Sequence, residues 1–100
     1  MSSIEPVKLP ESAARDLLVQ PVEPVYPDTA KAGALRGSVV LQVLVGRDGS
    51  VQDAKFLQGS LVFGRAAIDA VKQWRFKPYS MNGRAVSVQT VISLNFAPPA

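Results

Sequence analysis

The stretch GSVVLQVLVGRDGSVQDAKFLQG, residues 37–59, decides the fold because it predicts two strands joined by a tight turn. Apolar residues occupy every odd position of the range Val39–Val45, which is the alternation of a strand with one fully buried face. Asp48-Gly49 is a strong hairpin signal, because tight reversing turns need positive φ angles. The second strand alternates less regularly, and Val51, which is out of phase, indicates a bulge after it.

An amphipathic helix is predicted after this hairpin. Its apolar residues recur at spacings of three and four, while charged residues take the opposite side. We expect Pro78 to end it. The apolar positions are Phe63, Ala66, Ala67, Ala70, Val71 and Trp74.

A third strand is predicted over residues 86–96, after a turn at Asn82-Gly83. Even positions of this range are apolar or threonine, and Ser87, Gln89, Val91, Ser93 and Asn95 alternate with them. The range contains no charged residue and no proline, which are the usual guards of an exposed edge strand. We therefore expect this strand to accept a partner.

The order strand, strand, helix, strand predicts an α+β fold. Placing the third strand beside the first gives a three-stranded antiparallel sheet of order 2-1-3, a split β-α-β unit with a right-handed crossover. One main helix and one short helix, the latter expected over residues 27–35, pack on one face. Phe63 and Trp74 are then buried against the odd residues of the first strand.

Three regions are expected along the 100-residue chain. Residues 1–23 are proline-rich and predict an extended tail or linker, with a possible short helix over 11–18. Residues 24–97 form the folded domain, and 98–100 a short tail. The longest uninterrupted apolar run is three residues, against the roughly 20 needed to span a bilayer.

The run WRFKPY, residues 74–79, mixes aromatic and basic side chains in a chain of net charge +3. Base stacking with phosphate contacts is one interpretation, but a stacking platform needs an open surface or groove. Trp74 lies instead on the apolar side of its predicted helix, so core closure is the favoured interpretation and no nucleic-acid partner is expected. Binding that weakens steeply with salt would indicate the alternative.

An enzyme is not expected. The chain has no cysteine and no histidine, which removes thiolate sites, the usual general base and the commonest metal ligand. Asp48, Asp53 and Asp69 share no motif, and the glycine-containing runs lack the spacing of a phosphate-binding loop. We therefore expect no catalytic residues, no metal site and no cofactor.

Residues 24–96 resemble the C-terminal domain of TonB-type energy transducers. The shared features occur in order and at the expected spacing. They are Tyr26-Pro27, Gly37 before the first strand, the Asp48-Gly49 hairpin, and an Ala-Val helix that ends in Trp74, Arg75, Phe76 and Pro78.

The resemblance implies a periplasmic domain of a protein anchored to the inner membrane. Such a domain transmits force from inner-membrane motor proteins to outer-membrane transporters by binding their short plug-side segment. The chain lacks the family's membrane helix and proline-rich spacer and is therefore expected to be a fragment. A Gln-Pro pair of the best-known relative contacts the transporter, and the matching residues here are Glu23 and Pro24.

The expected contact is strand addition along the free edge of residues 86–96, in which main-chain hydrogen bonds supply most of the adhesion. The same edge predicts a homodimer by strand pairing at high concentration. A related envelope-bridging adaptor or self-association module without a role in transport is the alternative. The predicted partner-binding residues are Glu23, Pro24, Val86, Ser87, Val88, Gln89, Thr90, Val91, Ile92, Ser93 and Leu94.

Overall fold

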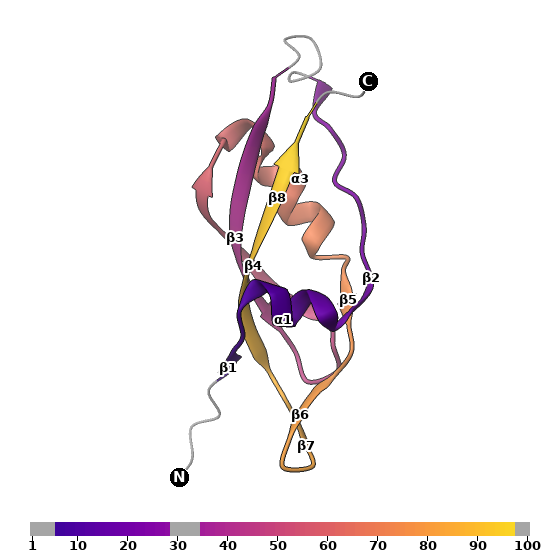
Figure 1. Ribbon diagram of the computed structural model, residues 1–100. Helices are drawn as coiled ribbons and strands as arrows, with labels where there is room; N and C mark the ends of the chain where they lie inside the picture. Colours follow the sequence, from indigo (N-terminus) through magenta and orange to yellow (C-terminus); the bar gives the residue numbers. More distant parts are fainter. Residues whose placement is uncertain (1–5, 29–34, 98–100) are drawn as a thin grey trace.

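A long β-hairpin forms one side of the main sheet in the computed structural model, which describes residues 6–28 and 35–97 (Figure 1). Strand β3 (Gly37–Val45) pairs antiparallel with β4 (Val51–Gly59). The odd residues of β3 from Val39 onward are at most 4% exposed, as their alternation predicts. The bulge expected after Val51 is confirmed, because successive β3 residues pair with Val51 and Asp53.

The predicted turn at Asp48-Gly49 is also confirmed. Gly49 has a φ of 89°, and Asp48 Oδ1 accepts hydrogen bonds from the Ser50 amide at 3.0 Å and the Ser50 hydroxyl at 2.7 Å. These bonds, the hydroxyl's first, lower the pKa of Asp48. The turn is thus fixed both by the backbone freedom of glycine and by a local carboxylate contact.

The sheet has four strands rather than the expected three, in the order β1-β8-β3-β4. Strand β8 (Val88–Phe96) pairs antiparallel with β3, so the predicted arrangement of the three long strands is present within the sheet. The addition is β1 (Val7–Lys8), which pairs parallel with the start of β8. The description as a purely antiparallel three-stranded sheet is therefore wrong, because the unguarded outer edge of β8 has recruited a segment of its own chain.

Helix α3 (Leu61–Val71) covers one face of the sheet and buries Phe63, Ala67 and Val71 (Figure 1). It ends well before Pro78, because the chain after Trp74 extends into β5 (Arg75–Phe76), which pairs with β2 (Leu18–Gln20). Trp74 follows the helix rather than belonging to it.

Trp74 and Phe63 both lie in the core, as predicted. Trp74 is 3% exposed, and its Nε1 donates a hydrogen bond to the Val22 carbonyl at 2.8 Å. The ring of Phe63 stacks on that of Phe96, with centroids 4.5 Å apart. The opening of the helix and the end of β8 are thereby joined by aromatic packing.

A second hairpin precedes β8. Strand β6 (Tyr79–Met81) pairs with β7 (Arg84–Val86) across the turn predicted at Asn82-Gly83, whose φ angles are 53° and 79°. Val86 consequently faces Tyr79 in this hairpin, and the third long strand begins at Val88 rather than at residue 86. The predicted strand was too long because its alternation runs without a break across two elements.

Residues 7–20 pack on the domain instead of extending away from it. Helix α1 (Glu11–Asp16) lies within the range predicted for a short helix and buries Ala14. Strands β1 and β2 flank this helix, and α1 passes across the edge of the sheet (Figure 1). The second helix expected over residues 27–35 falls largely on residues 29–34, outside the described residues.

Candidate functional site

The outer edge of β8 presents its main-chain groups at odd positions. The Ser87 carbonyl accepts a hydrogen bond from the Val7 amide at 2.9 Å, and the Gln89 carbonyl accepts one from the Leu9 amide at 3.0 Å. Ser93 uses both its amide and its carbonyl on the same side. Val91, midway along this edge, has a side chain that is 40% exposed.

The even positions of β8 belong to the core. Their side chains lie on the inner face of the sheet and are at most 9% exposed: Val88, Thr90, Ile92 and Leu94. The predicted partner-binding range thus divides by parity. Its odd members direct main-chain groups toward the outer edge, whereas the backbone groups of the even members from Val88 to Leu94 point to β3; Val86 pairs with Tyr79 instead.

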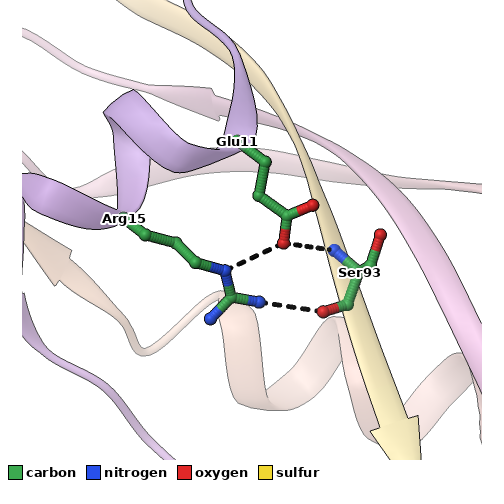
Figure 2. Close-up of polar contacts among 3 residues, drawn as sticks. All are labelled: Glu11, Arg15 and Ser93. Carbon is green, nitrogen blue, oxygen red and sulfur yellow. Dashed lines mark hydrogen bonds and ion pairs between the residues drawn. The ribbon is translucent and has the colours of Figure 1, made fainter.

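Two side chains of α1 form hydrogen bonds with the main-chain amide and carbonyl of Ser93 (Figure 2). Glu11 Oε2 accepts a hydrogen bond from the Ser93 amide at 3.0 Å, and Arg15 Nη2 donates one to the Ser93 carbonyl at 2.8 Å. Arg15 Nε also donates to the same Glu11 oxygen at 2.8 Å. The three residues form what we call the clamp. Within the clamp, Glu11 and Arg15 supply the acceptor and the donor that one residue of a neighbouring strand would offer to Ser93.

The Glu11 carboxyl of the clamp is ionised at neutral pH. Partial burial raises the pKa of Glu11, but hydrogen bonds from the Ser93 amide and from Arg15, together with the charge of Arg15, outweigh burial and leave the pKa lower than 4.5. Arg15 also lies over the Trp74 ring, 5.7 Å from its centroid. The cation of the clamp therefore contacts the core as well as the edge.

Between β1 and the clamp, a cleft of about 180 Å³ separates the N-terminal residues from β8. Its walls include Leu9 and Pro10 on one side and Thr90 and Val91 on the other. The buried Thr90 hydroxyl has no hydrogen-bond partner within the described part of the chain. Residues 7–16 thus contact β8 at two places, β1 and the clamp, and the cleft lies between these two contacts.

Glu23 and Pro24 lie beside the C-terminal end of β8. Together with Tyr26 they line a hollow of about 360 Å³ whose other wall is formed by Asn95, Phe96 and Ala97. The structure therefore brings the two predicted parts of the site together, although they are far apart in the sequence.

The segment around Glu23 is held in place at both ends. The Val22 carbonyl accepts the hydrogen bond from Trp74, and the Tyr26 hydroxyl donates to the Leu35 carbonyl. The ring of Tyr26 also packs against Phe63 at 5.5 Å between centroids. Glu23 itself is exposed, so its carboxylate is presented to solvent next to the strand end.

Sequence reasoning missed Glu11 and Arg15. Their spacing of four residues is the signal of an ion pair on a helix surface, and the structure contains that pair. Nothing local indicates that both side chains also bind Ser93, which lies 82 residues after Glu11. Such a contact follows only from the packing of α1 against β8.

Within residues 6–28 and 35–97, no cluster of three or more potential ligand side chains could hold a metal ion. In the same ranges, no helix has both the length and the apolar character needed to cross a bilayer.

The family described as "Gram-negative bacterial TonB protein C-terminal" matches residues 22–98 of the chain. The Protein TonB of Xanthomonas campestris pv. campestris strain B100 is 32% identical over 76 residues, which is 74% of this chain and 34% of that protein. The Protein TonB of Vibrio cholerae is 27% identical over 77 residues, 75% of this chain and 32% of that protein. The chain therefore spans about a third of the length of these curated relatives.

Two solved structures have a similar fold. The solution NMR structure of the Pseudomonas aeruginosa TonB CTD aligns with a TM-score of 0.68 at 30% identity, covering 79% of this chain and 82% of that one. The Vibrio anguillarum TonB2 structure aligns with a TM-score of 0.61 at 24% identity, covering 84% and 85% respectively. The second likeness concerns the fold alone.

Proposed function

Because the chain belongs to the family of Gram-negative bacterial TonB protein C-terminal domains, we propose that it is the transporter-binding domain of an energy transducer. In this role it works in the periplasm, engages outer-membrane transporters and passes on force from a proton-driven motor in the inner membrane. The chemistry required of the domain is reversible adhesion, not catalysis.

The proposed mode of binding is addition of a strand from the transporter to the outer edge of β8. The observation that carries this proposal is β1, because the edge already accepts an added strand through the Ser87 and Gln89 carbonyls. Main-chain hydrogen bonds would supply most of the adhesion and the exposed odd side chains only weak selectivity. A single short strand buries little area, so binding is modest and reversible.

Glu23 and Pro24 are proposed as a second contact. They share a hollow with the last residues of β8, so a strand running along the whole edge would reach them. The resemblance places a glutamine-proline pair at this point, and the acid here adds a negative charge to the contact. A peptide with a basic residue at that end is expected to bind better than its neutral counterpart.

The test is a pair of proline substitutions on neighbouring residues of β8. Val91→Pro removes an amide that points to the outer edge, and we expect the protein to fold while its affinity for a transporter peptide falls roughly tenfold or more. Thr90→Pro removes an amide directed at β3, and we expect it to damage folding instead. Affinity is measured by titration with a synthetic plug-end peptide, and folding by circular dichroism and urea unfolding.

Alanine variants separate backbone from side-chain effects. Val91→Ala and Thr90→Ala keep both amides, so they should bind the peptide within about twofold of the wild type, since binding depends on the main chain. Equal peptide affinity for folded Val91→Pro and the wild type would mean that the contact does not lie along β8. The hollow at Glu23 would then be the remaining candidate.

A further inference from the structure

The N-terminal residues that cover β8 do so at the place where the proposed partner would bind. We define residues 7–16, which comprise β1 and α1, as the strap. It bonds to Ser87, Gln89 and Ser93, all of which direct their main-chain groups to the outer edge. An added strand needs these same groups, so it cannot pair along the edge while the strap is in place.

The strap supplies what β8 lacks as an edge strand. Residues 88–96 contain no charged residue and no proline, whereas edge strands of natural proteins are commonly guarded by charges. Glu11 and Arg15 bring an ion pair to the middle of the edge (Figure 2). The match to the family begins at residue 22, so the strap lies ahead of the matched domain.

The strap is attached weakly along its length and firmly at its end. Strand β1 has two residues, and the ion pair of the clamp joins side chains that are 40% and 30% exposed, a class of ion pair that contributes little to stability. The cleft lined by Leu9 and Pro10 of the strap and by Val91 of β8 leaves part of the strap without close packing on β8. Immediately after the strap, the Leu17 carbonyl accepts a hydrogen bond from the Lys77 amide at 2.7 Å, and Leu18 pairs with Phe76.

These features describe a segment that can leave the edge while its C-terminal end stays bound. We propose that the strap is an intramolecular occupant of the β8 edge, which an incoming transporter strand must displace before it can pair. This inference rests on the strand addition proposed above. Only molecules with an open strap can then bind the transporter strand, so the apparent affinity equals the intrinsic affinity multiplied by the fraction of molecules in which the strap is open. It also keeps a second copy of the chain from pairing with the same edge.

The first experiment locks the strap. Lys8 and Gln89 are directly paired in the parallel register, and the chain has no cysteine, so Lys8→Cys combined with Gln89→Cys offers one disulfide only. We expect the oxidised protein to bind the plug-end peptide at least about tenfold more weakly than the same protein reduced with dithiothreitol. The comparison is made within one variant, so changes at Gln89 itself cancel. Equal affinity in the two redox states would overturn the inference.

The second experiment opens the strap. Glu11→Ala removes the acceptor for the Ser93 amide, and we expect roughly three- to tenfold tighter peptide binding. Asp16→Ala is the matched control, because it removes an exposed carboxylate from the same helix outside the clamp and should behave as the wild type. Hydrogen exchange at the Val7 and Leu9 amides, which bond to the Ser87 and Gln89 carbonyls, reports opening without any peptide and should accelerate in Glu11→Ala alone. Equal exchange rates of these amides in all three proteins would contradict the inference.

Measuring self-association shows whether the strap inference is wrong or only the proposed function is wrong. If no form of the protein binds a transporter peptide, the proposed function is wrong, but the strap can still be judged by sedimentation. Glu11→Ala should then self-associate at a lower concentration than the wild type and Asp16→Ala, because its edge is less guarded. If Glu11→Ala remains as monomeric as both and also binds no peptide, the strap excludes no strand and the inference is wrong.

Discussion

Gly49 combines two constraints that a single side chain would violate. Its φ of 89° lies in the left-handed region, and a Cβ at this position would overlap the carbonyl oxygen of Phe76. The close approach arises because the Phe76 amide donates a hydrogen bond to the Gly49 carbonyl at 2.8 Å. The hairpin turn between β3 and β4 is therefore also the docking point for β5.

We expect Gly49→Ala to destabilise the domain much more than Gly83→Ala. Both glycines have positive φ, so each substitution costs about 1–2 kcal/mol from backbone conformation alone. A Cβ on Gly83 meets no atom within 4 Å, whereas one on Gly49 would push β5 away from the turn. Urea unfolding of the two variants measures the difference, and equal losses would show that β5 does not depend on this contact.

The dipeptide Asp48-Gly49 was sufficient to predict the positive φ and the turn, because those follow from local backbone preferences. The contact with Phe76 could not be predicted in the same way. It joins residues 27 apart and depends on where the chain goes after α3. Gly83, by contrast, has only the local role that Asn82-Gly83 indicates.

At the scale of elements, α1 owes its position to its contacts. Six residues are too few for a stable isolated helix, so packing must hold it. Ala14 contributes an apolar contact and the clamp contributes polar ones. Because one of the clamp groups is a carboxylate, the attachment of α1 to β8 depends on pH.

The sign of that dependence follows from the lowered pKa of Glu11. A carboxyl group with a lower pKa in the folded state stabilises that state above its unfolded pKa, and this contribution is lost as pH falls through the folded pKa. We therefore expect the strap to stay attached at neutral pH and to loosen in acid, below pH 4.5. The NMR shift of the Ser93 amide should report this titration.

Two variants serve as controls for the acid transition. In Glu11→Ala the Ser93 amide should show no such titration, whereas in Asp16→Ala it should titrate as in the wild type. A Ser93 transition with a midpoint above the ordinary glutamate value would mean that burial, rather than the hydrogen bonds to the carboxylate, dominates the pKa of Glu11.

Three of the long elements were predicted from a period of their own. Strand β3, the helix α3 and the long strand β8 each carry enough residues to display an alternation of two or a spacing of three and four. Strands β1, β2, β5, β6 and β7 have two or three residues each. So short a segment shows no period, and it becomes a strand only because a partner is beside it.

For the whole molecule, the arrangement of the long strands followed from their order and from the handedness of the crossover. The covering of the β8 edge by residues 7–16 did not follow from either. Proline-rich composition suggested that the first 23 residues were a tail, and composition carries no information about which residues will meet Ser93. Of the proposed site, the edge and Glu23-Pro24 were expected from sequence, whereas the strap that lies on the edge was found only in three dimensions.

The parallel pairing of β1 with β8 has a mechanical consequence. Pro6 leads directly into β1, and Ala97 directly follows β8. Because the two strands run in the same direction, tension applied between these residues pulls them in opposite senses along their common axis, and the β1 hydrogen bonds are loaded in shear. Strand β1 is two residues long and β8 is paired with β3 along nine, so β1 must yield first.

We expect optical-tweezer traces of the chain, pulled from Pro6 and Ala97, to show a small early extension before global unfolding. In the oxidised Lys8→Cys, Gln89→Cys protein the disulfide carries the load past residues 9–88, so both this step and the global extension should be absent and should return on reduction. A single rupture in the wild type would exclude a separately yielding strap. If the step is present, the strap covers the outer edge of β8 when the domain is under no tension, and it leaves that edge when the domain is stretched. Tension in the chain would then itself determine when β8 is open to a partner strand.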